Sequence, residues 1–208
     1  MSEPANPPRF APLTADQMTE AQSRAADQIL ASAKRADGPG GRYMAKTGEF
    51  PGPYGFLLRS PELAIRWRHL SEYIRFETSL PLRLNELAIL IQARFWTAQF
   101  EWWAHYPLAL RAGLAQAVAD DLKMGKRPAG MQSDEEAVYA FCVELMQEHR
   151  VADATFAKLQ SHLTEQQIAD LVAVTGFYAT VSMILNTIEA PVPAGEALPL
   201  SPLSEPLR

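Results

Sequence analysis

The stretch from Leu80 to Gly113 most restricts what this chain can fold into. It reads LPLRLNELAILIQARFWTAQFEWWAHYPLALRAG and has no glycine or proline between Leu82 and Tyr106. Apolar residues recur there at Leu84, Leu87, Ala88, Leu90 and Ile91. This recurrence predicts a buried helix face rather than a strand. A proline at position 81 suits the first turn of such a helix, where no backbone donor is lost.

Three residues suited to proton transfer lie in this otherwise apolar stretch: Glu86, Glu101 and His105. Glu101 and His105 are four residues apart, so on one helix their side chains share a face. Glu86 precedes Glu101 by 15 residues, or roughly 22 Å along a straight helix. Either Glu86 plays no part in a shared site, or the chain reverses between Phe95 and Ala98. Taken alone, the Glu101–His105 pair is more typical of an ordinary surface pair on a helix than of a catalytic pair.

The same stretch resembles the carboxymuconolactone decarboxylase family, which shares its fold with the alkylhydroperoxidase D-like proteins. The resemblance is sharp over 80–114 and looser over 42–191. It is carried by Leu80-Pro81-x-Arg83, Glu86–Leu90, Phe100–Trp102 with His105, and Ala109–Leu114. It implies an all-α, alkylhydroperoxidase D-like helical bundle that forms a homo-oligomer, as a trimer, hexamer or dimer. It also implies a break between two helices that folds Glu86 back toward Glu101 and His105.

The redox branch of that superfamily has two cysteines between the matching glutamate and histidine. In this chain those two positions hold Ala98 and Glu101, and the single cysteine is Cys142, far downstream. Thiol–disulfide exchange needs an attacking thiolate and a resolving thiol. The sequence therefore excludes thiol peroxidase chemistry at this site and leaves acid–base chemistry open.

The resemblance implies a cofactor-independent lyase (decarboxylase) or isomerase that acts on a small carboxylated lactone or related ring compound, in aromatic catabolism. His105, oriented by Glu101, is the expected proton donor, and Glu86 is the second acid or base. No organic cofactor is expected. No metal is expected either, because His69, His149 and His162 have no ligand spacing. Two alternatives stay open: a hydrolase or lactonase with the same residues, and a non-catalytic oligomeric binding protein.

Five further residues are candidates for substrate binding. Arg83 or Arg94 would hold a substrate carboxylate in a bidentate contact, although a helix-face arginine is also typical of structural ion pairs. Trp102 and Phe100 would wall the pocket. Tyr54 ends a glycine- and proline-rich loop over 36–54, which is either a lid for the site or a surface loop.

Composition and patterning indicate one all-α domain. The chain has 208 residues, of which 48% are hydrophobic, and no period-two pattern indicates strands. Residues 1–13 are expected to form an extended arm, 14–189 the single helical domain, and 190–208 a proline-rich, non-helical tail. Capping boxes are expected at Thr14 with Gln17, Ser133 with Glu136, and Thr164 with Gln167. The helix over 165–188 is apolar on nearly all sides, which favours a bundle centre or a subunit interface.

Charge and cysteine content restrict the partners and the compartment. A net charge of −5 and a pI near 5.4 argue against nucleic acid or an anionic membrane as a partner. The N-terminal residues show no signal-peptide pattern, and no apolar run has the length of a membrane span. A single cysteine suits a reducing cytoplasm, and the expected partner is a small-molecule substrate.

Overall fold

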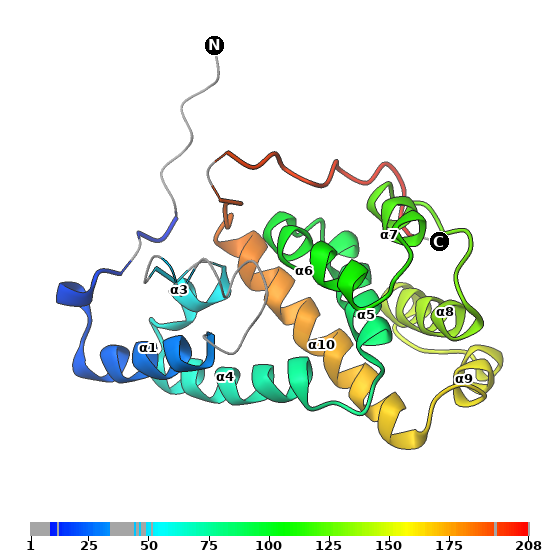
Figure 1. Ribbon diagram of the computed structural model, residues 1–208, viewed down its shortest axis with the longest axis horizontal. Helices are drawn as coiled ribbons and strands as arrows, with labels where there is room; N and C mark the ends of the chain where they lie inside the picture. Colours follow the sequence, from blue (N-terminus) through cyan, green and yellow to red (C-terminus); the bar gives the residue numbers. More distant parts are fainter. Residues whose placement is uncertain are drawn as a thin grey trace, which may run out of the picture.

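The computed structural model describes residues 9–11, 13–33, 44, 46, 49–50, 52–193 and 195–207. Over these residues the fold is all-helical and contains no strand, as predicted (Figure 1). The helices are the short 3-10 turn η1 (Ala15–Gln17), α1 (Glu20–Ala33), α3 (Pro53–Leu57), α4 (Pro61–Phe76), α5 (Leu82–Phe95), α6 (Gln99–Arg111), α7 (Gln116–Lys123), α8 (Ser133–Glu148), α9 (Asp153–Gln160) and α10 (Glu165–Thr187).

Helix α5 is the centre of the bundle. It packs against α6, α7, α8 and α10, and every residue from Leu84 to Arg94 is buried. Helix α10 runs across the molecule beside α5 (Figure 1). By length and composition α10 could cross a membrane, but 56% of its apolar window is buried inside the fold. Within the chain, α10 is thus a core helix, in line with the bundle-centre alternative.

A smaller hydrophobic cluster joins the N-terminal helices. Helix α1 packs on α4, and α3 packs on both α4 and α10. Ala25, Ile29, Leu57, Leu58 and Ala64 are buried in this cluster. The first helical segment of the domain is interrupted, because the extended Met18 separates η1 from α1. Most of the 36–54 loop lies outside the described residues, and Tyr54 at its end belongs to α3.

The predicted reversal between α5 and α6 is confirmed. Helix α5 ends at Phe95, α6 begins at Gln99, and Thr97 between them has φ +50°. The amide of Thr97 donates to the carbonyl of Arg94, and the amide of Ala98 donates to that of Ala93. These two bonds are those of a Schellman motif, which closes a helix on a left-handed residue. The motif turns the chain so that α6 packs back along α5.

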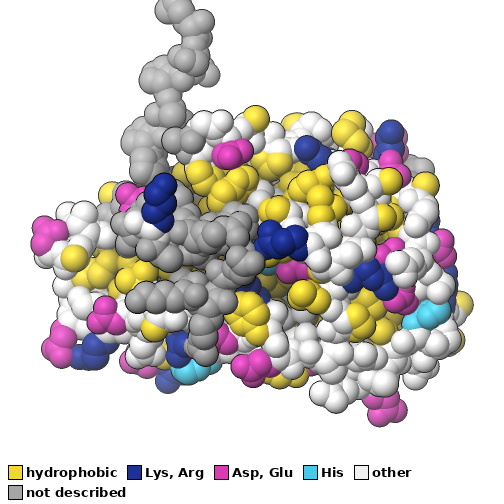
Figure 2. Space-filling model, in the orientation of Figure 1, with side chains coloured by type: hydrophobic (Ala, Val, Ile, Leu, Met, Phe, Trp, Pro, Cys, Tyr) yellow, Lys and Arg dark blue, Asp and Glu magenta, His cyan; other side chains and the backbone are white. Residues whose placement is uncertain are grey.

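Two of the three expected capping boxes form at the predicted residues, at Thr14 and at Thr164. The third forms one residue earlier, with Gln132 and Glu135 in place of Ser133 and Glu136. Residues 190–193 and 195–207 are non-helical and pass over α6, α7 and α8 (Figure 1). On the face shown in Figure 2, acidic and basic side chains are interspersed, with hydrophobic side chains exposed between them.

Candidate active site

The helix reversal brings Glu86, Glu101 and His105 into one buried cluster, called the triad below. The Nδ1 atom of His105 lies 2.8 Å from Oε2 of Glu86, on the neighbouring helix. Its Nε2 atom lies 3.1 Å from Oε1 of Glu101, one turn earlier on α6. All three side chains are at least 90% buried. Each ring nitrogen therefore faces a carboxylate, and a histidine that donates to both must carry two protons.

The pKa of His105 reflects this placement. Burial by itself would lower it, but the charges and hydrogen bonds of Glu86 and Glu101 outweigh burial and raise it from 6.5 to about 9. The imidazole is therefore a cation at neutral pH. A protonated histidine between two carboxylates can supply a proton to either of them.

Tyr178 of α10 completes the surroundings of the triad, and sequence reasoning missed it. Its ring meets the His105 ring edge-on at a centroid distance of 5.1 Å. Burial, together with the charges of Glu101 and Glu86, raises the pKa of Tyr178 well above 10, while Arg75 acts in the opposite direction. The only sequence signal was a phenol within an otherwise apolar helix, where a tyrosine is usually a core residue.

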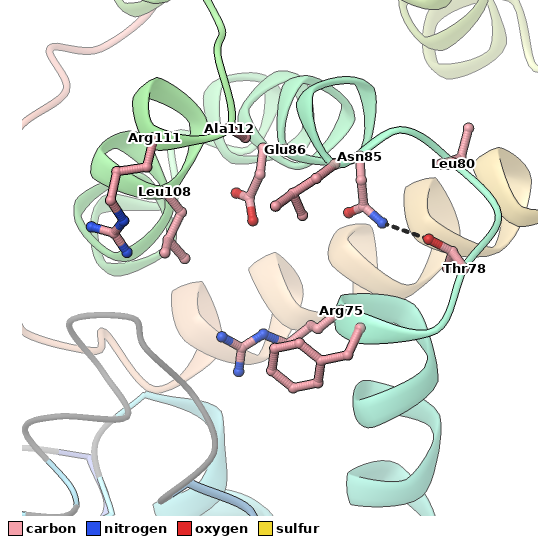
Figure 3. A pocket seen from close by; sticks show the side chains of 10 residues that line it. Arg75, Thr78, Leu80, Asn85, Glu86, Leu108, Arg111 and Ala112 are labelled. Atoms are coloured by element: carbon pink, nitrogen blue, oxygen red, sulfur yellow. Dashed lines mark hydrogen bonds between the residues drawn. The ribbon is translucent and has the colours of Figure 1, made fainter.

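A cavity of about 410 Å³ opens beside the triad, between the ends of α4 and α6 and the start of α5 (Figure 3). Its lining comprises Arg75, Phe76, Thr78, Leu80, Leu82, Asn85, Glu86, Leu108, Arg111 and Ala112. Glu86 is the member of the triad in this lining. A ligand in the cavity would meet Glu86 directly and His105 through it. Figure 3 shows Arg75 and Arg111 pointing toward the space in front of Glu86, from opposite walls.

The two arginines expected to hold substrate lie elsewhere. Arg83 forms ion pairs with Asp134, at 2.7 Å, and with Glu135 of α8. Arg94 is 1% exposed, and its Nη1 lies 3.3 Å from the hydroxyl of Thr97. Neither lines the cavity. The arginines that do line it are Arg75 and Arg111, in the last turns of α4 and α6. A basic residue in the last turn of a helix is usually explained by its interaction with the helix dipole, so nothing in the sequence singled out these two.

The expected aromatic walls belong to the packing around the triad. Trp102 is buried and its ring lies 6.0 Å from that of Tyr106. Phe100 packs against Trp103 with ring centroids 5.4 Å apart. Tyr54 donates a 3.4 Å hydrogen bond to Ser71 and influences the ionisation of Tyr178. The aromatic side chain at the cavity itself is Phe76.

Cys142 lies outside the triad. It is buried on α8, with its sulfur 3.6 Å from the hydroxyl of Thr175. Burial raises its pKa to about 12, so the thiol stays protonated at neutral pH and is a poor nucleophile. Among the residues described, no group of three or more histidine, cysteine, aspartate or glutamate side chains is arranged to hold a metal ion.

Solved structures with the same arrangement of helices share little sequence with this chain. An uncharacterized peroxidase-related protein from Ralstonia eutropha JMP134, with an alkylhydroperoxidase AhpD core, matches at a TM-score of 0.68 and 17% identity, over 91% of this chain and 95% of that one. An uncharacterized peroxidase-related protein from Silicibacter sp. TM1040 matches at a TM-score of 0.69 and 13% identity, over 93% of this chain and 96% of that one. The debrominase Bmp8 was solved as a cysteine-to-alanine variant with 2,3,4-tribromopyrrole. It matches at a TM-score of 0.64 and 15% identity, over 91% of this chain and 94% of that one.

No protein-family model matches the sequence, and a search of curated proteins finds no match. The structural matches agree with one another and each covers more than nine-tenths of this chain. The helices, their order and the reversal ahead of the triad thus form an alkylhydroperoxidase AhpD-like fold.

Proposed function

We propose that this protein is a cofactor-independent lyase or isomerase that transfers a proton to or from a carbon atom of a small carboxylated ring compound. The observation that carries the proposal is the triad. A buried, protonated His105 lies between Glu86 and Glu101, and Glu86 lines a cavity large enough for a small molecule. Ligand cavities commonly have volumes from about 300 to 1,000 Å³.

The triad has the parts that a decarboxylation needs. The bond between the substrate carbon and its carboxylate breaks, CO₂ leaves, and the electron pair remains on the ring as an enolate. A proton passes from the imidazolium of His105 to Glu86 across the 2.8 Å contact and from Glu86 to that carbon, and a proton from solvent then restores the imidazolium. Glu101, 3.1 Å from the other ring nitrogen, keeps the imidazole oriented while its charge changes. In an isomerase, Glu86 would remove a proton from one carbon and return it to another.

The cavity lining supports an anionic ring compound as the substrate class. Two arginines accompany one glutamate in the lining, and Phe76, Leu82 and Leu108 supply apolar surface. Guanidinium groups bind carboxylates in bidentate geometry, and apolar walls weaken the competition from water. A small ring compound is also what the debrominase Bmp8 holds in its solved structure.

Proton transfer to carbon can be followed without knowing the natural substrate. The protein would be incubated with a panel of carboxylated γ-lactones in D₂O, with proton NMR to detect deuterium on carbon and a separate assay for CO₂. We expect Glu86→Gln to lower the rate at least about 100-fold. The matched control is Glu77→Gln, which changes an exposed carboxylate at the end of α4 and should leave the rate unchanged.

A folded Glu86→Gln variant with full activity would contradict the proposal. The products separate the remaining alternatives. Release of CO₂ indicates a decarboxylase, deuterium uptake without CO₂ an isomerase, and a ring-opened diacid a lactonase that uses Glu86 to activate water. Ligand binding with no change in any lactone would favour a binding protein of the same fold.

A further inference from the structure

Asn85 lines the cavity and is both buried and incompletely hydrogen-bonded. It is 2% exposed. Its amide nitrogen donates to the carbonyl of Ile74 at 2.9 Å and to the hydroxyl of Thr78 at 3.1 Å. Its Oδ1 atom has no hydrogen-bond partner.

The orientation of this amide is fixed by its neighbours. The carbonyl of Ile74 can only accept, so the atom of Asn85 that faces it must be the nitrogen. Turning the amide over would place two oxygens against each other and lose that hydrogen bond. Oδ1 is therefore held toward the cavity, away from Thr78 (Figure 3).

An unpaired buried acceptor at a cavity wall favours a ligand that carries a donor. Leaving such a group unsatisfied is unfavourable, and a hydroxyl or N–H of the ligand would supply the missing partner. In Figure 3 the guanidinium of Arg111 lies on the far side of Glu86 from Asn85, and that of Arg75 lies across the space from Glu86. The guanidinium of Arg75 lies 5.0 Å from the centre of the Phe76 ring. The polar groups at the two ends of the cavity therefore differ, with cations at one end and an acceptor at the other.

We propose that the cavity selects a small ring acid with a hydroxyl or N–H donor on the side opposite its carboxylate. Arg75 and Arg111 bind the carboxylate, and Asn85 accepts the hydrogen bond from the donor. The ring lies between them, over Glu86 and against Leu82 and Leu108. This inference deepens the proposed function, since it places the substrate's reacting carbon at Glu86, but the binding preference can be measured without turnover.

The test uses benzoate, meta- and para-hydroxybenzoate, and para-hydroxybenzamide as probes, with binding to the full chain measured by calorimetry at pH 7 and low salt. At least one hydroxybenzoate should bind about tenfold or more tighter than benzoate, because only it pairs with Asn85. It should also bind about tenfold tighter than the uncharged hydroxybenzamide, which lacks the carboxylate. Equal affinity across the series, or no binding at millimolar concentration, overturns the proposal.

Variants locate the two ends of the ligand. Asn85→Leu should remove the preference for the hydroxyl and leave benzoate binding within about twofold. Arg75→Gln and Arg111→Gln should weaken every carboxylate probe about tenfold and keep the hydroxyl preference. Arg66→Gln, on the exposed face of α4 in an ion pair with Glu62, is the matched control and should change nothing. A folded Asn85→Leu protein that still prefers the hydroxyl refutes the role of Asn85.

The probe series in the unsubstituted protein keeps the test decisive if Asn85→Leu fails to fold. The outcome is also separable from that of the proposed function. A hydroxyl preference in a protein that turns over no lactone would refute the enzyme and leave this inference standing. If the protein turned over lactones but showed no preference for the hydroxyl, the enzyme would stand and this inference would be refuted.

Discussion

His105 keeps its proton because two carboxylates together outweigh the cost of burying a charge. The balance depends on the contacts at 2.8 Å to Glu86 and 3.1 Å to Glu101. Loss of either carboxylate leaves a buried imidazolium with less compensation, which lowers its pKa. The charge state of the imidazole therefore depends on residues from both α5 and α6, and it couples the stability of the fold to pH.

The direction of that pH dependence follows from the raised pKa. A group whose pKa is higher in the folded state stabilises the fold fully below its unfolded pKa, near 6.5, and loses that contribution as pH rises through about 9. We expect the free energy of unfolding to fall by roughly 3 kcal/mol over this window. Urea denaturation at pH 6, 7, 8 and 9 measures it.

His105→Gln provides the control, since glutamine does not titrate. Its free energy of unfolding should change less over the same window, and the difference from the parent isolates His105. The pKa values of Tyr106 and Cys142, both about 12, lie above the window. Parallel pH profiles for the two proteins would show that His105 is not held as a cation.

At the scale of elements, the helix periodicity in 80–113 was enough to predict buried helices, but not the boundary between them. Breaks are usually marked by glycine or proline, and the stretch from Leu82 to Tyr106 has neither. The chain reverses instead at Thr97, a β-branched residue with φ +50°. The family resemblance supplied this break, because the matching spacing of Glu86 and His105 implies that the two helices fold back on each other.

The cavity was less predictable than the triad. Arg75 and Arg111 come from the ends of two helices that are adjacent only in the folded chain. Arg83, expected from the sequence to hold a substrate carboxylate, is instead turned toward α8 by Asp134 and Glu135. Residues three apart on a helix can share a face, but which partner each one meets depends on the neighbouring helices, and no local pattern records that.

The reversal at Thr97 can be tested with two substitutions of opposite effect. Thr97→Asn should stabilise the protein by about 0.5–1 kcal/mol, because asparagine adopts the left-handed conformation more readily than a β-branched residue and its side-chain oxygen can replace the hydroxyl as the acceptor for Arg94. Thr97→Val keeps the branched shape but removes the hydroxyl that pairs with Arg94. It should destabilise the protein by about 1–2 kcal/mol. Thermal unfolding of both variants shows whether each substitution raises or lowers the stability. A change in the same direction for both variants would refute this account.

At the scale of the whole molecule, the C-terminal segment ties together helices that are distant in sequence. The side chain of Gln99 donates to the carbonyl of Leu200 at 2.8 Å and accepts from its amide at 2.9 Å. Farther along, Leu203 packs beside Gly125, where an added Cβ would lie 2.5 Å from the leucine. The side chain of Gln147 donates to the carbonyl of Leu207. The segment thus contacts α6, the end of α7, and α8 in turn.

Two leucines of this segment are buried in the main hydrophobic core, which makes the segment part of the fold rather than a loose tail. Leu200 is 4% exposed and Leu207 is fully buried, whereas Leu198 is 66% exposed. We expect Leu200→Ala and Leu207→Ala each to lower the free energy of unfolding by about 2–4 kcal/mol, through lost burial and a residual cavity. Leu198→Ala makes the same chemical change at an exposed position and should cost less than about 0.5 kcal/mol. Chemical denaturation of the three variants measures these differences. Equal, small effects would mean that the segment is not packed on the helices in solution. A large effect confined to the two buried leucines would mean that the segment helps to hold α6 and α8 in place around the triad.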